Sequence, residues 1–138
     1  MNSKMTLEEY TINHSDPEDP ILSELSRETH LKVPGARMLS GYLQGKLIEF
    51  ISKMIQPEYV LEIGTYTGYS AICWAKGLKE KGCIHTIELN DERESIIRKY
   101  INKANLNSKI ILHIGDAKDI IPRLEIKFDI VFIDADKP

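Results

Sequence analysis

Apolar positions along the chain follow two different periods. Between Leu39 and Pro57 they recur every three or four residues, which lines one face of a helix, and the proline ends that helix. The positions concerned are Leu43, Leu47, Ile51 and Met54. Four short runs rich in β-branched residues come next, and runs of this kind are typical of strands. They lie at 59–63, 83–89, 110–114 and 128–133.

Helical patterns separate these runs. One helix is predicted from about Ser70 to Leu78, and a second begins at Asp91, where Glu94 three residues later resembles a capping box. A third, short helix is limited by Pro122. Strands that alternate with helices at this spacing form right-handed βαβ units. We therefore predict an α/β fold with a mostly parallel, doubly wound sheet and helices on both faces.

The amino-terminal segment differs from the rest in composition. Residues 1–35 are polar, are interrupted by three prolines and carry an acidic stretch at 16–19. We predict a leader over residues 1–35, with one short helix around Ile21–Thr29, and a ligand-binding domain over residues 36–138. The last residues follow the fourth predicted strand directly. We therefore expect residues 36–138 to be the amino-terminal portion of a larger domain that is truncated after this strand.

Length and composition indicate one ordinary globular unit. The chain has 138 residues, of which 42% are hydrophobic and 28% charged, and these values exclude wholesale disorder and a disulfide-rich scaffold. Eighteen basic and 21 acidic side chains give a net charge of -3 without a Lys/Arg cluster, so a nucleic-acid partner is not supported. No apolar stretch approaches the roughly 18–20 residues of a membrane span, so we expect no membrane partner and a cytoplasmic location.

The segment LEIGTYTGYS at 61–70 is the most informative one for chemistry. A strand that enters a glycine turn and then a helix presents free backbone N–H groups, and glycine lets a ligand approach the main chain. This pattern predicts a nucleotide-like ligand. A dinucleotide motif that starts at Gly64 would need glycines where Tyr66 and Tyr69 stand, so an NAD-dependent dehydrogenase is the weakest interpretation. Glu62, just before the turn, would repel a diphosphate and suits a ligand with an ammonium or sulfonium charge.

Candidate ligand-binding residues also follow the second and third predicted strands. Glu88 stands 20 residues after Gly68, where a carboxylate can accept two hydrogen bonds from a ribose diol, and a solvated strand-end carboxylate is the alternative. Asp116 and Ala117 are placed to bracket an adenine ring, although Gly115-Asp116 is also a common turn dipeptide.

Asp134, Asp136 and Lys137 form a charged cluster at the end of the fourth predicted strand. Carboxylates at that position suit a hard divalent cation. A lysine near a cation in a partly dry site also loses its proton more easily than it does in water. The alternative is a solvated loop whose charges are fortuitous.

Together these segments resemble the class I S-adenosylmethionine-dependent O-methyltransferases, in particular the cation-dependent branch with the caffeoyl-CoA and catechol O-methyltransferases. The resemblance covers roughly Ile21 to Pro138 and rests on four motifs in a specific order and spacing. They are LEIGTYTGYSA, the acid in HTIEL, the IGDA turn and FIDADKP. It implies a Rossmann-like methyltransferase fold, S-adenosyl-L-methionine as cofactor, a divalent cation (Mg²⁺ or Ca²⁺) and a small hydroxylated, catechol-like acceptor. We also expect a homodimer.

Carried over position by position, the resemblance implies a set of residues that line the cofactor. They are Met38 and Ser40 from the preceding helix, Glu62, Gly64, Tyr66, Gly68 and Ser70 from the first strand and its turn, and Glu88, Asp116, Ala117, Asp134 and Asp136 from the later strand ends. Ser70 is implied to lie near the methionine carboxylate and Glu88 to bind the ribose hydroxyls. Asp116 and Ala117 flank the adenine.

The same resemblance implies the catalytic residues. Asp134 matches the first metal ligand of the family, and Asp136 matches a residue beside the amino group of the cofactor. Lys137 matches the lysine that takes the proton of the acceptor in catechol-type members. Asp134 and Lys137 are therefore the predicted catalytic residues. The two remaining protein ligands of the metal come from the next strand in the family.

Two alternative functions stay open. A tRNA hydroxyuridine O-methyltransferase would share the fold, and a basic surface would favour it. A non-catalytic cofactor-binding or oligomerisation module would agree with a sequence that contains one of the expected metal ligands. Failure of the protein to methylate any acceptor would favour that module.

Overall fold

Parallel strands form the centre of the molecule. The computed structural model describes residues 5–135, and within them four strands form one sheet in the order β3-β2-β1-β4. The strands are β1 (Tyr59–Ile63), β2 (Cys83–Glu88), β3 (Ile110–Ile114) and β4 (Ile130–Ile133). Leu61 of β1 pairs with His85 of β2 on one side and with Val131 of β4 on the other, and all pairings are parallel. The chain order reverses next to β1, and ligands of open α/β sheets bind at such a reversal.

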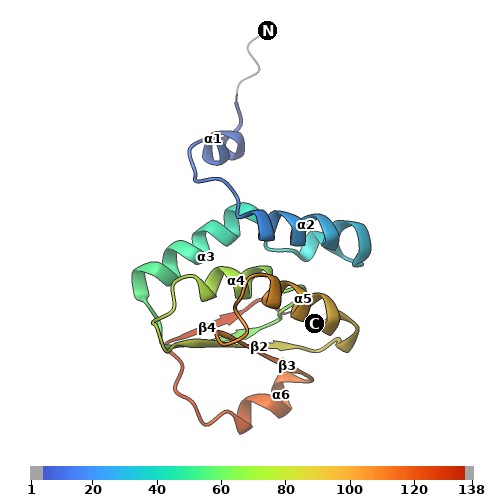
Figure 1. Cartoon of the computed structure of the whole chain (residues 1–138), viewed down its shortest axis with the longest axis vertical. Coiled ribbons are helices and arrows are strands. Elements are labelled where there is room, and N and C mark those ends of the chain that lie inside the picture. The colour runs from blue at the N-terminus through green and yellow to red at the C-terminus, as the bar shows by residue number, and fades with distance from the viewer. Residues whose placement is uncertain (1–4, 136–138) are drawn as a thin grey trace.

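Helices cover the sheet as the sequence predicts. The longer ones are α2 (Pro20–Lys32), α3 (Gly41–Ile55), α4 (Tyr69–Ala75) and α5 (Glu94–Lys103), and the short α6 (Ala117–Ile120) follows β3. Figure 1 shows α2, α3, α4 and α5 on one side of the sheet and α6 on the other. This arrangement confirms the predicted α/β class with a parallel, doubly wound sheet. No described helix is long and apolar enough to cross a membrane.

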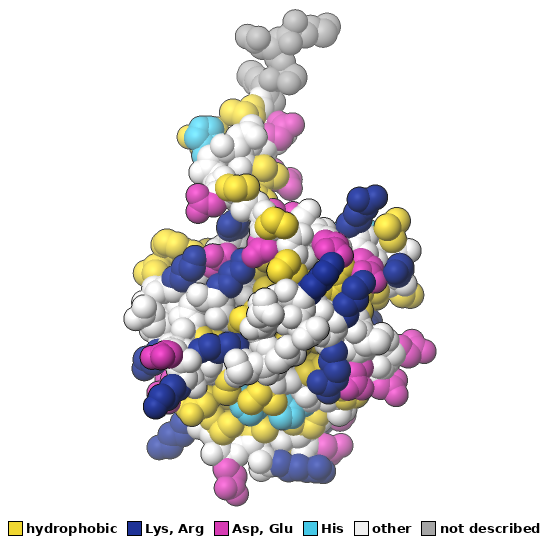
Figure 2. All heavy atoms as spheres, viewed as in Figure 1, with side chains coloured by type: hydrophobic (Ala, Val, Ile, Leu, Met, Phe, Trp, Pro, Cys, Tyr) yellow, Lys and Arg dark blue, Asp and Glu magenta, His cyan; other side chains and the backbone are white. Residues whose placement is uncertain are grey.

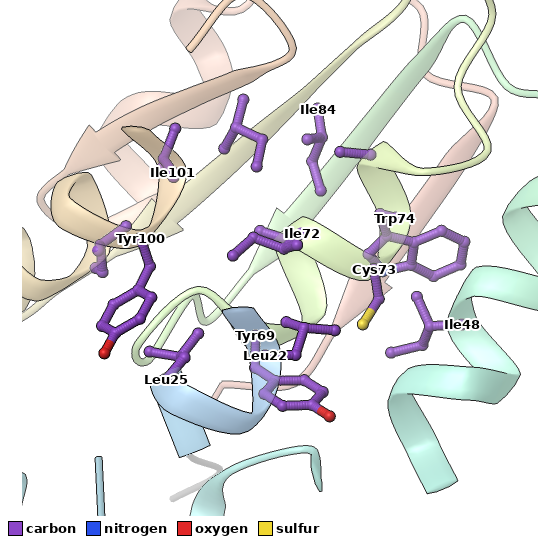
Figure 3. Packing of buried hydrophobic residues seen from close by; sticks show 14 of the residues in the cluster. Leu22, Leu25, Ile48, Tyr69, Ile72, Cys73, Trp74, Ile84, Tyr100 and Ile101 are labelled. Atoms are coloured by element: carbon purple, nitrogen blue, oxygen red, sulfur yellow. The ribbon is translucent and has the colours of Figure 1, made fainter. Parts of the chain in front are cut away.

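The core lies between the sheet and the helices on the α4 side. Every residue of α4 is buried, because this helix is enclosed by the sheet on one side and by α2 and α3 on the other. Figure 3 shows Ile72 and Trp74 of α4 among side chains from β2, α3 and α5. A Cβ on Gly45 of α3 would lie 2.6 Å from a ring carbon of Tyr69, so glycine permits the close approach of α3 and α4.

The predicted leader contributes to this core. The helix expected around Ile21–Thr29 is α2, and its Leu25 is fully buried. A second helix, α1 (Leu7–Asn13), was missed, although its signal is in the sequence. The Thr6 hydroxyl accepts the N–H of Glu9, and the Glu9 carboxylate accepts the N–H of Thr6, which is a reciprocal capping box. The boundary between leader and domain stays a prediction.

Several predicted boundaries need correction. The helix expected from about Ser70 to Leu78 is α4, which ends at Ala75, and the strand expected at 83–89 ends at Glu88. The capping box at Asp91 is wrong, because the Asn90 side chain instead accepts the N–H of Glu92 at 3.0 Å and caps a 3-10 turn, Asp91–Arg93. Helix α5 begins only after this turn. The fourth strand begins at Ile130 rather than at Phe128. Its predicted second residue, Asp129, uses its carboxylate to accept the N–H groups of Glu58 and Tyr59 at 2.7 and 3.0 Å.

Candidate functional site

A cavity of about 440 Å³ opens at the carboxyl ends of the four strands. Its size lies within the range of roughly 300–1,000 Å³ that is usual for small-molecule sites. It is lined by residues 38–40 in front of α3, 63–66, 69 and 70 around the β1–α4 turn, 87–90 and 93 after β2, 115–118 after β3, and 134 and 135 after β4. The cavity therefore lies at the position predicted from the sequence for the ligand, at the carboxyl ends of the parallel strands.

The turn between β1 and α4 depends on three residues with positive φ. Gly64 has φ 101°, Tyr66 has φ 55° and Gly68 has φ 97°. A Cβ on Gly64 would lie 2.7 Å from the backbone nitrogen of Ala135. Gly64 thus lets the end of β1 pass directly against the chain that leaves β4. Gly68 is the N-cap residue directly before α4.

The turn does not present free backbone N–H groups in the way that the sequence suggests. Gly64 and Thr65 both donate to the carbonyl of Ile87, at 3.0 and 3.1 Å. Gly68 donates to the carbonyl of Thr65, and the N–H of Tyr66 donates to the side chain of Glu88. The prediction is wrong for these four groups, because the left-handed residues fold the turn back onto the end of β2. These four N–H groups are therefore not available to a ligand.

Glu62 lies fully buried beneath this turn. The Ser70 hydroxyl donates to one carboxylate oxygen, and the Thr86 hydroxyl donates to the other at 2.6 Å. Burial raises the pKa of Glu62 to about 7 against the lowering effect of these two hydrogen bonds. The carboxylates of Asp134 and Glu88 push that pKa in the same direction as burial. Near neutral pH the Glu62 side chain is therefore poised between its charged and its neutral form.

We expect Glu62→Gln to flatten the pH dependence of stability. The folded chain keeps a proton on Glu62 up to about pH 7, whereas the unfolded value is 4.5, so stability falls as pH rises through this window. The free energy of unfolding should drop by on the order of 2 kcal/mol between pH 5 and pH 7 in the parent and by much less in Glu62→Gln. Urea unfolding at several pH values measures both slopes.

Glu28→Gln is the matched control for that slope. A hydrogen bond from Lys99 lowers the pKa of Glu28 to about 2, so Glu28 stays charged throughout this window. The variant should shift the free energy of unfolding without changing its slope between pH 5 and pH 7. Parallel slopes for the parent and Glu62→Gln would show that Glu62 does not titrate there.

Glu88 closes β2 and faces the cavity with 3% of its surface exposed. One carboxylate oxygen accepts the N–H of Tyr66 at 2.7 Å. The other accepts the N–H of Asn90 and Nη1 of Arg93, both at 3.0 Å. The Arg93 guanidinium also lies over the ring of Tyr66, 4.7 Å from its centroid. Sequence reasoning missed Arg93, because only the 3-10 turn after Asn90 directs this side chain back to Glu88.

The remaining predicted residues reach the cavity from several loops. Met38 and Ser40 line it from the segment in front of α3 and not from a preceding long helix, since Met38 ends a 3-10 turn and Ser40 directly precedes α3. Ala117 and Asp116 line it after β3. The Asp116 side chain also accepts the N–H of Lys118 at 2.8 Å and thereby caps α6.

The predicted catalytic cluster is described only in part. Asp134 lies at the end of β4, lines the cavity and donates its N–H to the carbonyl of Ile63. Asp136 and Lys137 lie outside the described residues. Among residues 5–135 no group of three or more His, Cys, Asp or Glu side chains gathers in a way that could hold a metal ion. Asp134 alone cannot complete the coordination of a hard divalent cation, which takes about six oxygen ligands, so the other ligands of such an ion would have to come from outside residues 5–135.

Most of the predicted cofactor residues thus share one cavity. Those that line it are Met38, Ser40, Gly64, Tyr66, Ser70, Glu88, Asp116, Ala117 and Asp134. Glu62 lies beneath the cavity, and Gly68 stands at the start of α4. Their roles in binding stay predictions, because juxtaposition alone does not identify the ligand.

Comparison with known proteins decides the family. A family model described as O-methyltransferase matches residues 12–138. The chain belongs to this family. The family that the sequence motifs predict is therefore confirmed.

Two relatives and one solved structure show how far the likeness of this O-methyltransferase chain extends. A catechol O-methyltransferase of Niastella koreensis is 37% identical over 99 residues, which cover 69% of this chain and 45% of that protein. Caffeoyl-CoA O-methyltransferase 2 of Zea mays is 32% identical over 127 residues, which cover 88% of this chain and 48% of that protein. A crystal structure of an SAH-bound methyltransferase from Podospora anserina has a TM-score of 0.86 at 31% identity and covers 93% of this chain and 55% of that one. The chain spans about half the length of the curated relatives it matches.

Proposed function

We propose that this chain is the cofactor-binding part of an S-adenosyl-L-methionine-dependent O-methyltransferase that acts on a small catechol-like acceptor. The observation that carries the proposal is the position of Glu88. Its carboxylate closes β2 at the cavity, where a ribose diol would donate to it. The family supplies the reaction type, and the relatives named catechol and caffeoyl-CoA O-methyltransferase support a phenolic acceptor.

The charge of the cavity agrees with this cofactor. S-adenosylmethionine carries a sulfonium and an ammonium group. Four carboxylates lie at or beneath the cavity, those of Glu62, Glu88, Asp116 and Asp134, and they outnumber its two basic side chains, Arg93 and Lys118. A cation in the cavity would favour the charged form of Glu62 and lower its pKa. In this proposal Ser70 faces the amino-acid part of the cofactor with Glu62 behind it, and Asp116 and Ala117 flank the adenine.

Positioning is the main contribution of these residues to the reaction. Methyl transfer from a sulfonium is an in-line displacement, so the acceptor oxygen, the methyl carbon and the sulfur must be aligned. Residues of the β1–α4 turn and Glu88 would fix the cofactor at two ends, and the carboxylates would help to bind its positively charged groups. Asp134 is the residue of the described chain that we assign to a divalent cation, Mg²⁺ or Ca²⁺. Lys137, outside the described residues, is proposed to take the acceptor proton, and a cytoplasmic homodimer is proposed as well.

The distribution of charge gives no support to the tRNA alternative. Figure 2 shows Lys and Arg side chains interspersed with Asp and Glu over the face in view, and the whole chain carries a net charge of -3. A nucleic-acid surface instead gathers basic side chains.

A methyl-transfer assay tests the proposal. The whole protein would be supplied with S-adenosylmethionine labelled in its methyl group and offered either catechol or tRNA that contains hydroxyuridine. We expect label in catechol and none in tRNA. Label in tRNA would establish the alternative substrate. Cofactor binding without transfer to any acceptor would contradict the enzymatic function and favour a binding module.

A further inference from the structure

Arg93 occupies the carboxylate that the proposed function assigns to the ribose. Its Nη1 lies 3.0 Å from Oε1 of Glu88, and the Glu88 side chain is almost wholly buried. The same oxygen accepts the N–H of Asn90, and Oε2 accepts the N–H of Tyr66. Three donors from the described residues therefore already converge on this single carboxylate.

This occupation leaves too few acceptor positions for a diol. An ionised carboxylate offers about four lone-pair positions, and two hydroxyl donors would need two of them. With Tyr66, Asn90 and Arg93 in place, one position remains on Glu88. A vicinal diol can therefore bind fully only if one of the three donors leaves.

Arg93 is the donor that is free to leave. The N–H of Tyr66 belongs to the turn between Gly64 and Gly68, and the N–H of Asn90 belongs to backbone that the 3-10 cap holds in place. Arg93 instead donates from a long side chain, of which 23% is exposed. The guanidinium already lies over the ring of Tyr66, 4.7 Å from its centroid, and this contact does not depend on the hydrogen bond to Glu88.

We propose that Arg93 is a specificity-determining residue. Its hydrogen bond blocks the Glu88 carboxylate in the free chain, and only a ligand with a vicinal diol displaces it. The inference rests on the proposed function, since it takes the ligand to be an adenosyl cofactor. The diol replaces the hydrogen bond that Arg93 gives up, so Glu88 stays fully paired. A ligand without these hydroxyls offers no replacement, and a buried carboxylate that loses a donor is unfavourable. Such a ligand therefore binds with Arg93 still on Glu88.

Side-chain NMR of the parent chain tests the displacement directly. The chain contains five arginines, and loss of one ¹⁵Nε signal in Arg93→Met assigns that of Arg93. The probes are S-adenosylhomocysteine and its 2′,3′-dideoxy analogue. We expect S-adenosylhomocysteine to shift this signal and speed its hydrogen exchange, and we expect the analogue to leave it unchanged. An unchanged Arg93 signal in a chain saturated with S-adenosylhomocysteine would overturn the inference and leave the proposed function standing.

Affinities of the variants give a second test. Arg93→Met keeps the length of the side chain and removes the donor, so S-adenosylhomocysteine should bind about threefold to tenfold more tightly while the analogue is unaffected. Arg98→Met is the matched control, because Arg98 pairs with Glu94 on the exposed face of α5 and does not line the cavity. Weaker binding in Arg93→Met, or an equal change for both probes, would contradict the proposal. A parent chain that binds neither probe would instead overturn the proposed function.

Discussion

Gly64→Ala should lower the free energy of unfolding by about 3 kcal/mol or more, because the new methyl group meets backbone on a strained turn. An ideal Cβ at this position lies 2.7 Å from the nitrogen of Ala135, 2.8 Å from its Cα and 2.9 Å from the carbonyl carbon of Asp134. Backbone atoms cannot move aside as a flexible side chain can. Relief would require β1 and the chain after β4 to separate, and this movement would also open the cavity.

Gly41→Ala separates this contact from the cost of the backbone conformation. Gly41 also has a positive φ, 74°, but no described atom lies within 4 Å of its ideal Cβ. We expect this control to lose about 1 kcal/mol, from the left-handed conformation alone. Urea unfolding followed by the fluorescence of Trp74, the single tryptophan, measures both variants. Equal losses would show that the ends of β1 and β4 do not approach each other this closely.

Glu88→Ala should weaken the binding of S-adenosylhomocysteine by about 10-fold to 150-fold, since it removes charge-assisted hydrogen bonds to the ribose. Glu88 is the carboxylate at the end of β2 that lines the cavity. Glu88→Gln keeps one acceptor oxygen without the charge and should fall between the parent and Glu88→Ala. Calorimetric titration of each variant gives the affinities.

Two controls keep that result interpretable. Glu92→Ala removes the same charge at an exposed site one turn away that does not line the cavity, and it should bind like the parent. Thermal unfolding shows whether Glu88→Ala remains folded, because the N–H groups of Tyr66 and Asn90 lose their acceptor in that variant. Unchanged affinity in folded Glu88→Ala would mean that Glu88 does not contact the ligand.

The sequence predicts the sheet better than the ends of its helices. The strands at 59–63 and 110–114 begin and end where expected, because compact runs of apolar, partly β-branched residues mark them. The start of α5 was misplaced because Asn90 and Asp91 are both good caps, and only the folded geometry selects Asn90. Helix α1 was overlooked although Thr6 and Glu9 carry the capping signal.

The sequence also predicts some features of the site and misses others. Motif spacing brings Gly64, Glu88 and Asp134 to one cavity, because parallel strands end at the same edge of the sheet. Spacing does not reveal that Arg93 binds Glu88, or that four N–H groups of the glycine turn already have acceptors. Both depend on how a turn folds back in three dimensions, and a linear pattern does not encode this.

Calorimetric titration of the chain with S-adenosylhomocysteine, and in parallel with NAD, tests the central claim most directly. The claim is that the cavity at the carboxyl ends of the strands takes an adenosyl cofactor without a pyrophosphate. Glu62 and Glu88 oppose a diphosphate, and Tyr66 and Tyr69 stand where a dinucleotide motif needs glycine. We expect heat of binding with one site per chain for S-adenosylhomocysteine and none for NAD. Tight binding of NAD without binding of S-adenosylhomocysteine would contradict the account.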